Sequence, residues 1–107
     1  MTKHFDDNNF IREVIEASEN KPVLVDFSAD WCAPCKIQGP IVEEVAQEAG
    51  DKAVVGKLDT EIAQETAAKF GIMGIPTLLI FKDRKVVENF VGLQTKETLI
   101  TAIEKHL

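Results

Sequence analysis

Two cysteines separated by two residues are the feature of this sequence best suited to chemistry. Cys32 and Cys35 lie in the stretch WCAPCK at positions 31–36, together with the only tryptophan of the chain. If a helix begins between the cysteines, their Cα atoms come within the roughly 4.4–6.8 Å that a disulfide requires. Pro34 favours that helix, because its fixed φ suits a first helical position, where its missing N–H has no partner to lose. The pair is therefore predicted to be a dithiol that can close to a disulfide.

The two cysteines are expected to have different roles because of their positions. Cys32 would stand at the helix start, where unpaired backbone N–H groups and the positive end of the helix dipole stabilise a thiolate. It is the expected nucleophile, partly exposed and with a low pKa, whereas Cys35, one turn into the helix, is the expected shielded partner.

Half of a metal site and a pair of inert packed thiols are the alternative interpretations of these cysteines. A structural zinc site needs about four ligands, and the two histidines, His4 and His106, lie near opposite ends of the chain. Inert buried thiols would require neither a proline between them nor a helix start. We therefore expect a redox pair and no bound metal.

Length, charge and hydropathy limit the class of protein. The 107 residues suit one domain, 1–107, and the net charge of −6 comes with no basic cluster, which argues against nucleic-acid binding. The most apolar stretch, residues 75–81, is far shorter than the ~18 residues of a membrane span. The first residues lack the apolar segment of a secretion signal. We expect a cytoplasmic monomer, and in a reducing cytosol a lone C-x-x-C is more often catalytic or metal-binding than structural.

A buried strand and a long helix are predicted to position the cysteines. Residues 23–29 predict a strand buried on both faces, in which Asp26 is out of place. A helix over 34–49 follows, and Gly50 ends it. Its sheet-facing side chains are expected to be Ile37, Ile41, Val45, Ala46 and Ala49.

The other elements follow from the same patterns of apolar spacing and capping residues. In chain order they are a short helix around 10–15 capped by Asp7, Asn8 or Asn9, a strand at 53–58, a helix around 62–70 capped by Asp59 or Thr60 with Ile62 on its packed face, a hairpin of strands 75–81 and 86–91, and a final helix capped by Thr95. This order predicts an α/β fold in which the cysteines follow the carboxyl end of a parallel strand, where open α/β sheets carry function.

Several short motifs surround the cysteine pair along the chain. They are Val25-Asp26-Phe27, the WCxPCK stretch, Pro40, Lys57, Gly74-Ile75-Pro76-Thr77 and Val91-Gly92. Together they resemble the thioredoxin family over nearly the whole chain, and a C-x-x-C beside a βαβ pattern is typical of that family. The resemblance implies the thioredoxin fold, a central mixed five-stranded sheet flanked by about four helices. It also implies a general protein dithiol-disulfide oxidoreductase.

The resemblance implies a reaction and its partners. Cys32 would attack a disulfide of an oxidised substrate protein, and Cys35 would resolve the mixed disulfide. An NADPH-dependent thioredoxin reductase would regenerate the dithiol. The chain itself is expected to bind no cofactor, because no strand is followed by G-x-G-x-x-G. Competing interpretations are a disulfide-forming oxidant, and a redox-independent binding or holdase module.

The resemblance also assigns roles to two charged residues. Asp26 would lie beneath the active-site helix as a buried carboxylate with a raised pKa, able to accept the proton of Cys35. Lys57 would be its charge partner. The alternative is a structural ion pair with no kinetic role.

A shallow apolar surface for an extended substrate segment is the last implied feature. In the family the bond before this proline is cis and faces the dithiol. The implied contact residues are Trp31, Ala33, Pro34, Gly74, Ile75, Pro76, Val91 and Gly92, with Leu93 at the edge. The alternatives are an ordinary strand start at Pro76 and ordinary apolar surface.

Several positions depart from the commonest family pattern. Ala33 stands in place of the usual glycine and is expected to alter the redox poise. Met73 stands where some members have a basic residue, which is expected to alter partner preference. Asp83-Arg84 replaces a frequent Asn-Gly, so a tight type I′ turn is not expected there.

Overall fold

A central sheet organises the protein, described by a computed structural model for residues 2–107. Over these residues it has five strands in the order β1-β3-β2-β4-β5. The bounds are β1 Lys3–Phe5, β2 Val23–Ser28, β3 Val54–Asp59, β4 Thr77–Lys82 and β5 Lys85–Val91. Strands β1 and β2 run parallel to β3, β4 runs antiparallel to β2, and β5 antiparallel to β4. The predicted mixed five-stranded sheet is confirmed.

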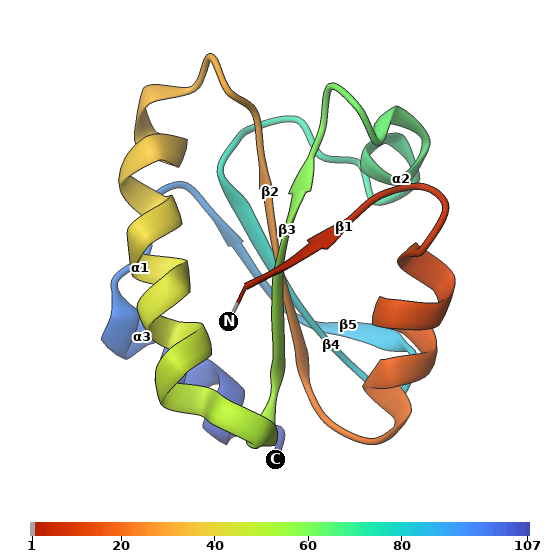
Figure 1. The fold of residues 1–107 in the computed structure, drawn as a ribbon, viewed down its shortest axis with the longest axis vertical. Helices are drawn as coiled ribbons and strands as arrows, with labels where there is room; N and C mark the ends of the chain where they lie inside the picture. The colour runs from red at the N-terminus through yellow and green to blue at the C-terminus, as the bar shows by residue number, and fades with distance from the viewer. Residues whose placement is uncertain (1) are drawn as a thin grey trace.

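Helices cover both faces of this sheet (Figure 1). Helices α1 (Ala33–Ala49) and α3 (Lys96–Glu104) lie on one face, and α2 (Gln64–Lys69) lies on the other with η1 (Ile11–Glu16). The short helix expected near the N-terminus is thus η1, a π-helix, continued by the 3-10 turn η2 (Ala17–Glu19). A further 3-10 turn, η3 (Gly50–Lys52), follows α1.

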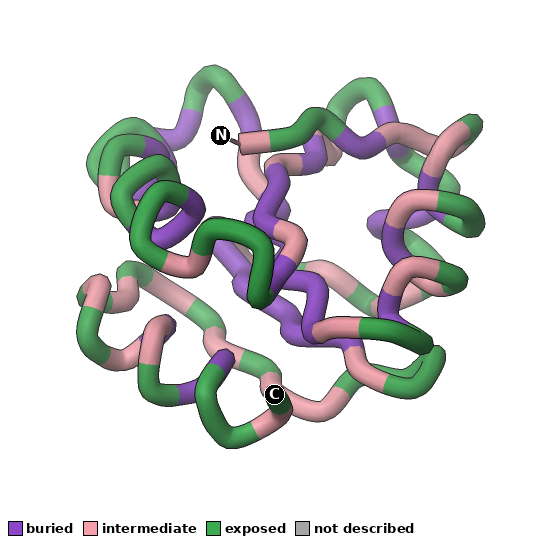
Figure 2. The backbone as a smooth tube through the Cα atoms, turned by 60° about the horizontal axis from the view of Figure 1, so that its bottom comes forward, coloured by how far each residue is buried: buried purple, intermediate pink, exposed green. Residues whose placement is uncertain are grey.

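Two apolar cores lie on the two faces of the sheet, and Figure 2 shows the buried central strands between them. Leu24 of β2 packs in the core under α1 and α3, whereas its neighbours Val23 and Val25 pack in the other core. Because side chains alternate along a strand, Asp26 faces the same side as Leu24. The sheet therefore directs this carboxyl group toward the face that α1 covers.

Helix α1 differs from its prediction in the face it buries. Ile37, expected to face the sheet, is 57 % exposed, while Gln38 and Val42 are completely buried. Val45 and Ala46 are buried as predicted, so the buried face differs from the prediction mainly in the first half of the helix. Ile41 and Ala49 are half-buried at the border of the core.

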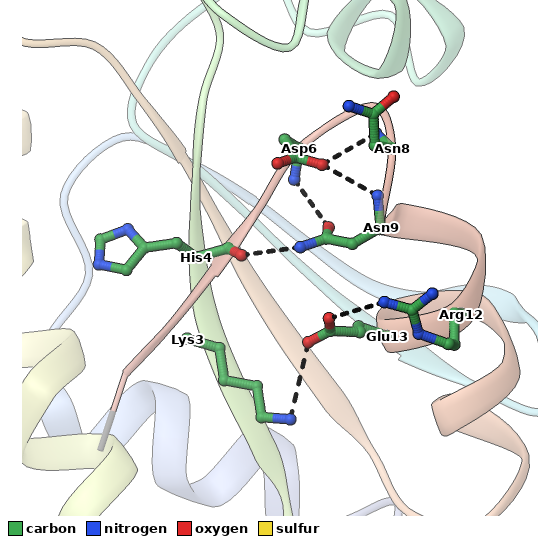
Figure 3. Close-up of polar contacts among 7 residues, drawn as sticks. All are labelled: Lys3, His4, Asp6, Asn8, Asn9, Arg12 and Glu13. Carbon is green, nitrogen blue, oxygen red and sulfur yellow. Dashed lines mark hydrogen bonds and ion pairs between the residues drawn. The ribbon is translucent and has the colours of Figure 1, made fainter.

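The connection from β1 into η1 is held by Asp6 (Figure 3). Asp6 Oδ1 accepts hydrogen bonds from the backbone N–H groups of Asn8 and Asn9 at 2.8 and 2.9 Å. Asn9 Oδ1 in turn accepts from the N–H of Asp6, and Asn9 Nδ2 donates to the carbonyl of His4. The prediction of Asp7, Asn8 or Asn9 as the helix cap was therefore wrong, because the loop forms its own turn before η1 begins.

Asp7 supports a different helix, far away in sequence. Its Oδ1 accepts from Thr66 N at 2.9 Å and from Thr66 Oγ1 at 2.6 Å, within the first turn of α2. The predicted caps of this helix, Asp59 and Thr60, were wrong, because Asp59 Oδ1 accepts from Glu61 N and Thr60 Oγ1 donates to a carbonyl of β2. Since α2 begins only at Gln64, Ile62 precedes it and is 74 % exposed rather than packed.

The β4–β5 hairpin closes through the tight turn that was not expected. Asp83 and Arg84 have φ values of 53° and 71°, the left-handed pair that a type I′ turn requires. Buried Ser18 explains why these non-glycine residues adopt it. Its carbonyl accepts from Asp83 N and its Oγ accepts from Arg84 N, both at 2.8 Å.

Candidate active site

The cysteine pair lies at the start of α1, shortly after the end of β2. Cys32 is the N-cap of α1, and its sulfur accepts a hydrogen bond from Cys35 N at 3.2 Å. Pro34 occupies the first turn, as predicted, and the two cysteines form a disulfide with Cα atoms 5.2 Å apart. A backbone donor and the positive end of a 17-residue helix thus both face the sulfur of Cys32.

The expected contrast in exposure between the cysteines is absent. Cys32 is 4 % exposed and Cys35 is 6 % exposed, so both are buried in the disulfide form. The carbonyl oxygen of Ile75 lies 3.8 Å from the sulfur of Cys32. The neighbouring Trp31, by contrast, is 70 % exposed.

One loop from another part of the chain contacts the disulfide, and a second loop is hydrogen-bonded to the first. The Ile75–Pro76 peptide bond is cis, as expected, and Thr77 Oγ1 donates to the carbonyl of Gly74. The carbonyl of Pro76 accepts from Gly92 N at 2.8 Å, which joins the loop before β4 to the loop after β5. The predicted contact residues of all three segments are thereby brought to one end of the sheet.

Exposed apolar side chains surround this end of the sheet. Val91 is 67 % exposed, Met73 97 % and Leu93 47 %. A surface pocket of about 350 Å³ lies between Trp31, Met73, Ile75 and the α2 region. The region around the disulfide is therefore an apolar surface with a shallow hollow beside it.

Asp26 is completely buried, and neither oxygen of its carboxylate has a hydrogen-bond partner. It lies in register with Lys57 of β3 and Leu78 of β4. Burial raises the pKa of Asp26 from 3.8 to about 6, and the positive charge of Lys57 opposes part of that rise. The carboxyl group is thus a stronger base than an ordinary aspartate.

Lys57 acts on Asp26 from a distance. Among the ion pairs of the described residues, which extend to 4.0 Å, none joins these two side chains. The ammonium group lies instead against Gly39 of α1, where an added Cβ would stand 2.9 Å from Nζ. Lys57 also borders a pocket of about 310 Å³ shared with His4, Asp30 and Asp59. Lys57 therefore influences the carboxylate of Asp26 through a longer-range electrostatic interaction.

Residues 2–107 contain neither a candidate metal centre nor a helix that could span a membrane. In that range no three His, Cys, Asp or Glu side chains are grouped so that they could hold a metal ion. No helix of the same range has the length and apolarity needed to cross a membrane.

Known proteins are similar to this chain in sequence. The family model described as "Thioredoxin" matches residues 1–105. The chain belongs to the thioredoxin family. Thioredoxin of Bacillus subtilis is 53 % identical over 79 % of this chain and 82 % of its own length. Thioredoxin of Staphylococcus saprophyticus is 48 % identical over 97 % and 91 %, and Thioredoxin 1 of Synechococcus elongatus is 46 % identical over 94 % and 92 %.

Membership of the thioredoxin family and the Cys32–Cys35 disulfide together establish the class of activity. The chain is a dithiol-disulfide oxidoreductase, and the redox-active pair supports protein-disulfide reductase activity. The family implies a thioredoxin reductase and substrate proteins as its partners. The predicted fold and family are confirmed.

Gln38 is a polar residue near the site that the sequence patterns did not single out. It is completely buried in α1, one turn after Cys35, and contacts the loop that follows β5. Its neighbours in sequence, Ile37 and Gly39, do not indicate whether Gln38 faces water or the core, so no local pattern predicts this role.

Proposed function

We propose that Cys32 is the attacking sulfur of this thioredoxin and Cys35 the resolving one. The Cys32 thiolate attacks one sulfur of a protein disulfide, and the other substrate sulfur leaves as a thiolate and takes a proton. Cys35 then loses its proton and attacks Cys32, which closes the Cys32–Cys35 disulfide and releases the second substrate sulfur. Two electrons pass from the dithiol to the substrate. The helix N-terminus that faces Cys32 is the observation that carries this assignment.

Asp26 is the proton acceptor for Cys35 in this scheme. With a pKa of about 6, it is largely ionised at neutral pH and yet more basic than a solvent-exposed carboxylate. Its unpaired oxygens are free to accept a proton, directly or through water. Lys57 keeps the anion accessible, because its charge limits the rise of that pKa.

The substrate segment lies across the apolar surface around the disulfide. We define the groove as Trp31, Ala33, Pro34, Gly74, Ile75, Pro76, Val91 and Gly92. An extended segment can pair with the backbone of Ile75, a mode that accepts many sequences because main-chain groups supply the hydrogen bonds. The exposed Trp31 and Val91 then cover its apolar side chains.

The setting in the cell follows from this proposal. The chain acts as a single domain, 1–107, a monomer in the cytoplasm, and an NADPH-dependent thioredoxin reductase returns it to the dithiol form. The absence of a membrane-spanning helix in residues 2–107 fits this setting.

Reduction of insulin by NADPH and a bacterial thioredoxin reductase tests the assignment of Cys32. We expect the wild type to support turnover and Cys32→Ser to abolish it. Turnover that persists in Cys32→Ser would exclude Cys32 as the nucleophile. If the wild type is silent with the reductase but active with dithiothreitol, the proposed electron donor is wrong and the sulfur chemistry stands.

A further inference from the structure

The side chain of Gln38 makes a two-point contact with the backbone of one residue. Gln38 Oε1 accepts from Gln94 N at 2.8 Å, and Gln38 Nε2 donates to Gln94 O at 3.1 Å. The amide thus satisfies both backbone groups of Gln94, as a neighbouring strand would. Because Gln38 is completely buried, water cannot easily replace these bonds if the amide is removed.

The residue that Gln38 holds belongs to a loop of the proposed groove. Gln94 lies between β5 and α3, two residues after Gly92. Its own side chain donates from Nε2 to the carbonyl of Gly92 at 3.1 Å. Gly92 N in turn donates to the carbonyl of Pro76 at 2.8 Å.

These contacts form a continuous series that begins at Gln38 and ends beside Cys32. From Gln38 it runs through Gln94 and Gly92 to Pro76 and the adjoining Ile75 carbonyl, which lies 3.8 Å from Cys32 Sγ. Helix α1 joins Cys32 back to Gln38. The two loops of the groove, around Pro76 and around Gly92, are therefore both linked to the helix that carries the two cysteines.

We propose that Gln38 is a positioning residue that fixes the loop 92–94 relative to the disulfide and so determines how well a protein disulfide is recognised. It acts on the groove and leaves the reactivity of the sulfurs unchanged, because none of its hydrogen bonds reaches Cys32 or Cys35. This inference rests on the proposed groove.

Replacement of Gln38 by methionine separates recognition from sulfur chemistry. Gln38→Met keeps the length of the side chain but leaves Gln94 N and O without their partner. We expect the second-order rate constant for oxidation of the reduced protein by insulin to fall about three- to tenfold, as a loss of substrate positioning. The rate constant with a small aromatic disulfide, which does not fill the groove, is expected to stay within about twofold of the wild type.

Controls address folding and the groove itself. Gln47→Met places the same change on the exposed side of α1 and is expected to alter neither rate. Gln94→Ala keeps both backbone bonds and removes only the arm to Gly92, so it is expected to give a smaller loss with insulin even if Gln38→Met fails to fold. Amide hydrogen exchange should become faster at Gln94 and Gly92 in Gln38→Met.

The outcomes distinguish this inference from the proposed groove. If Val91→Asp on the exposed surface leaves the insulin rate unchanged, the groove is wrong. If Val91→Asp slows insulin but folded Gln38→Met does not, the groove stands and the role of Gln38 is refuted. Equal losses with insulin and the small disulfide in Gln38→Met would also refute it, because they indicate a general disturbance of the sulfurs.

Discussion

Replacement of Asp26 by asparagine is expected to make the protein more stable and less active. A folded-state pKa of about 6, against 3.8 for the free side chain, means that ionised Asp26 destabilises the fold. At about 1.4 kcal/mol per factor of ten in the proton equilibrium, the cost reaches about 3 kcal/mol once both states are ionised. Asparagine removes the charge, so we expect Asp26→Asn to raise the free energy of unfolding by up to about 3 kcal/mol at pH 7.

The stability gained by Asp26→Asn should depend on pH. Between pH 3.8 and about 6 the folded protein keeps the Asp26 proton longer than the unfolded chain does, so wild-type stability falls as pH rises through this window. Below pH 3.8 both states are protonated and the cost vanishes. The gain from Asp26→Asn should therefore be largest at pH 7 and shrink toward zero as pH falls to about 4.

Denaturant unfolding of the oxidised protein at pH 4 and pH 7 measures this difference. Asp30→Asn, which removes an exposed charge at the end of the same segment, is the matched control and should not show the same pH-dependent gain. A gain from Asp26→Asn that is equal at both pH values would refute the argument from desolvation.

The kinetic part of the prediction concerns the second chemical step. Without its proton acceptor, Cys35 should resolve the mixed disulfide about ten- to a hundredfold more slowly at neutral pH. The wild-type rate of this step should rise with pH through about 6, and this dependence should disappear in Asp26→Asn. Unchanged resolution at neutral pH would remove Asp26 from the mechanism and leave it a buried structural charge.

Three other substitutions test contacts away from the sulfurs. Asp7→Asn should lower stability at neutral pH and not at low pH. The bonds from Thr66 lower the pKa of Asp7, so the stabilising effect of the carboxylate is lost as pH falls through that lowered value. Urea unfolding at several pH values measures this pH dependence. Ser18→Ala should lower the free energy of unfolding by about 1–3 kcal/mol, because Arg84 N loses a buried acceptor, and an unchanged midpoint would contradict the role of Ser18 in the turn. Met73→Lys should leave stability unchanged, since the side chain is 97 % exposed, and should change the KM of a thioredoxin reductase for the protein; identical KM values would show that position 73 does not contribute to docking.

Signals local in sequence predicted the elements that carry the cysteines. Pro34 marked the start of α1 and Gly50, with φ of 56°, its end. Thr95 caps α3 as expected, because its hydroxyl accepts from Thr98 N at 3.1 Å. Each of these signals acts within one turn of the chain, so neighbouring residues are enough to reveal it.

Contacts between distant segments account for what the sequence did not reveal. The turn at Asp83-Arg84 depends on Ser18, 66 residues before Arg84, and the start of α2 depends on Asp7, 59 residues before Thr66. Gln38 contacts a residue 56 positions away. A capping or turn pattern covers only a few adjacent residues, so it cannot reveal a partner that lies 56 or more positions away.

The two cysteines differ in their hydrogen bonds and not in their exposure. Burial cannot distinguish them, because both are nearly inaccessible in the disulfide form. The hydrogen bond does, since Cys32 Sγ accepts from Cys35 N, and no backbone donor to Cys35 Sγ is found among the described residues. A thiolate at Cys32 would therefore be stabilised by a donor and by the helix dipole, whereas one at Cys35 would be buried without that donor. The asymmetry that the reaction needs thus comes from the polarity of the helix end and does not require a more exposed sulfur.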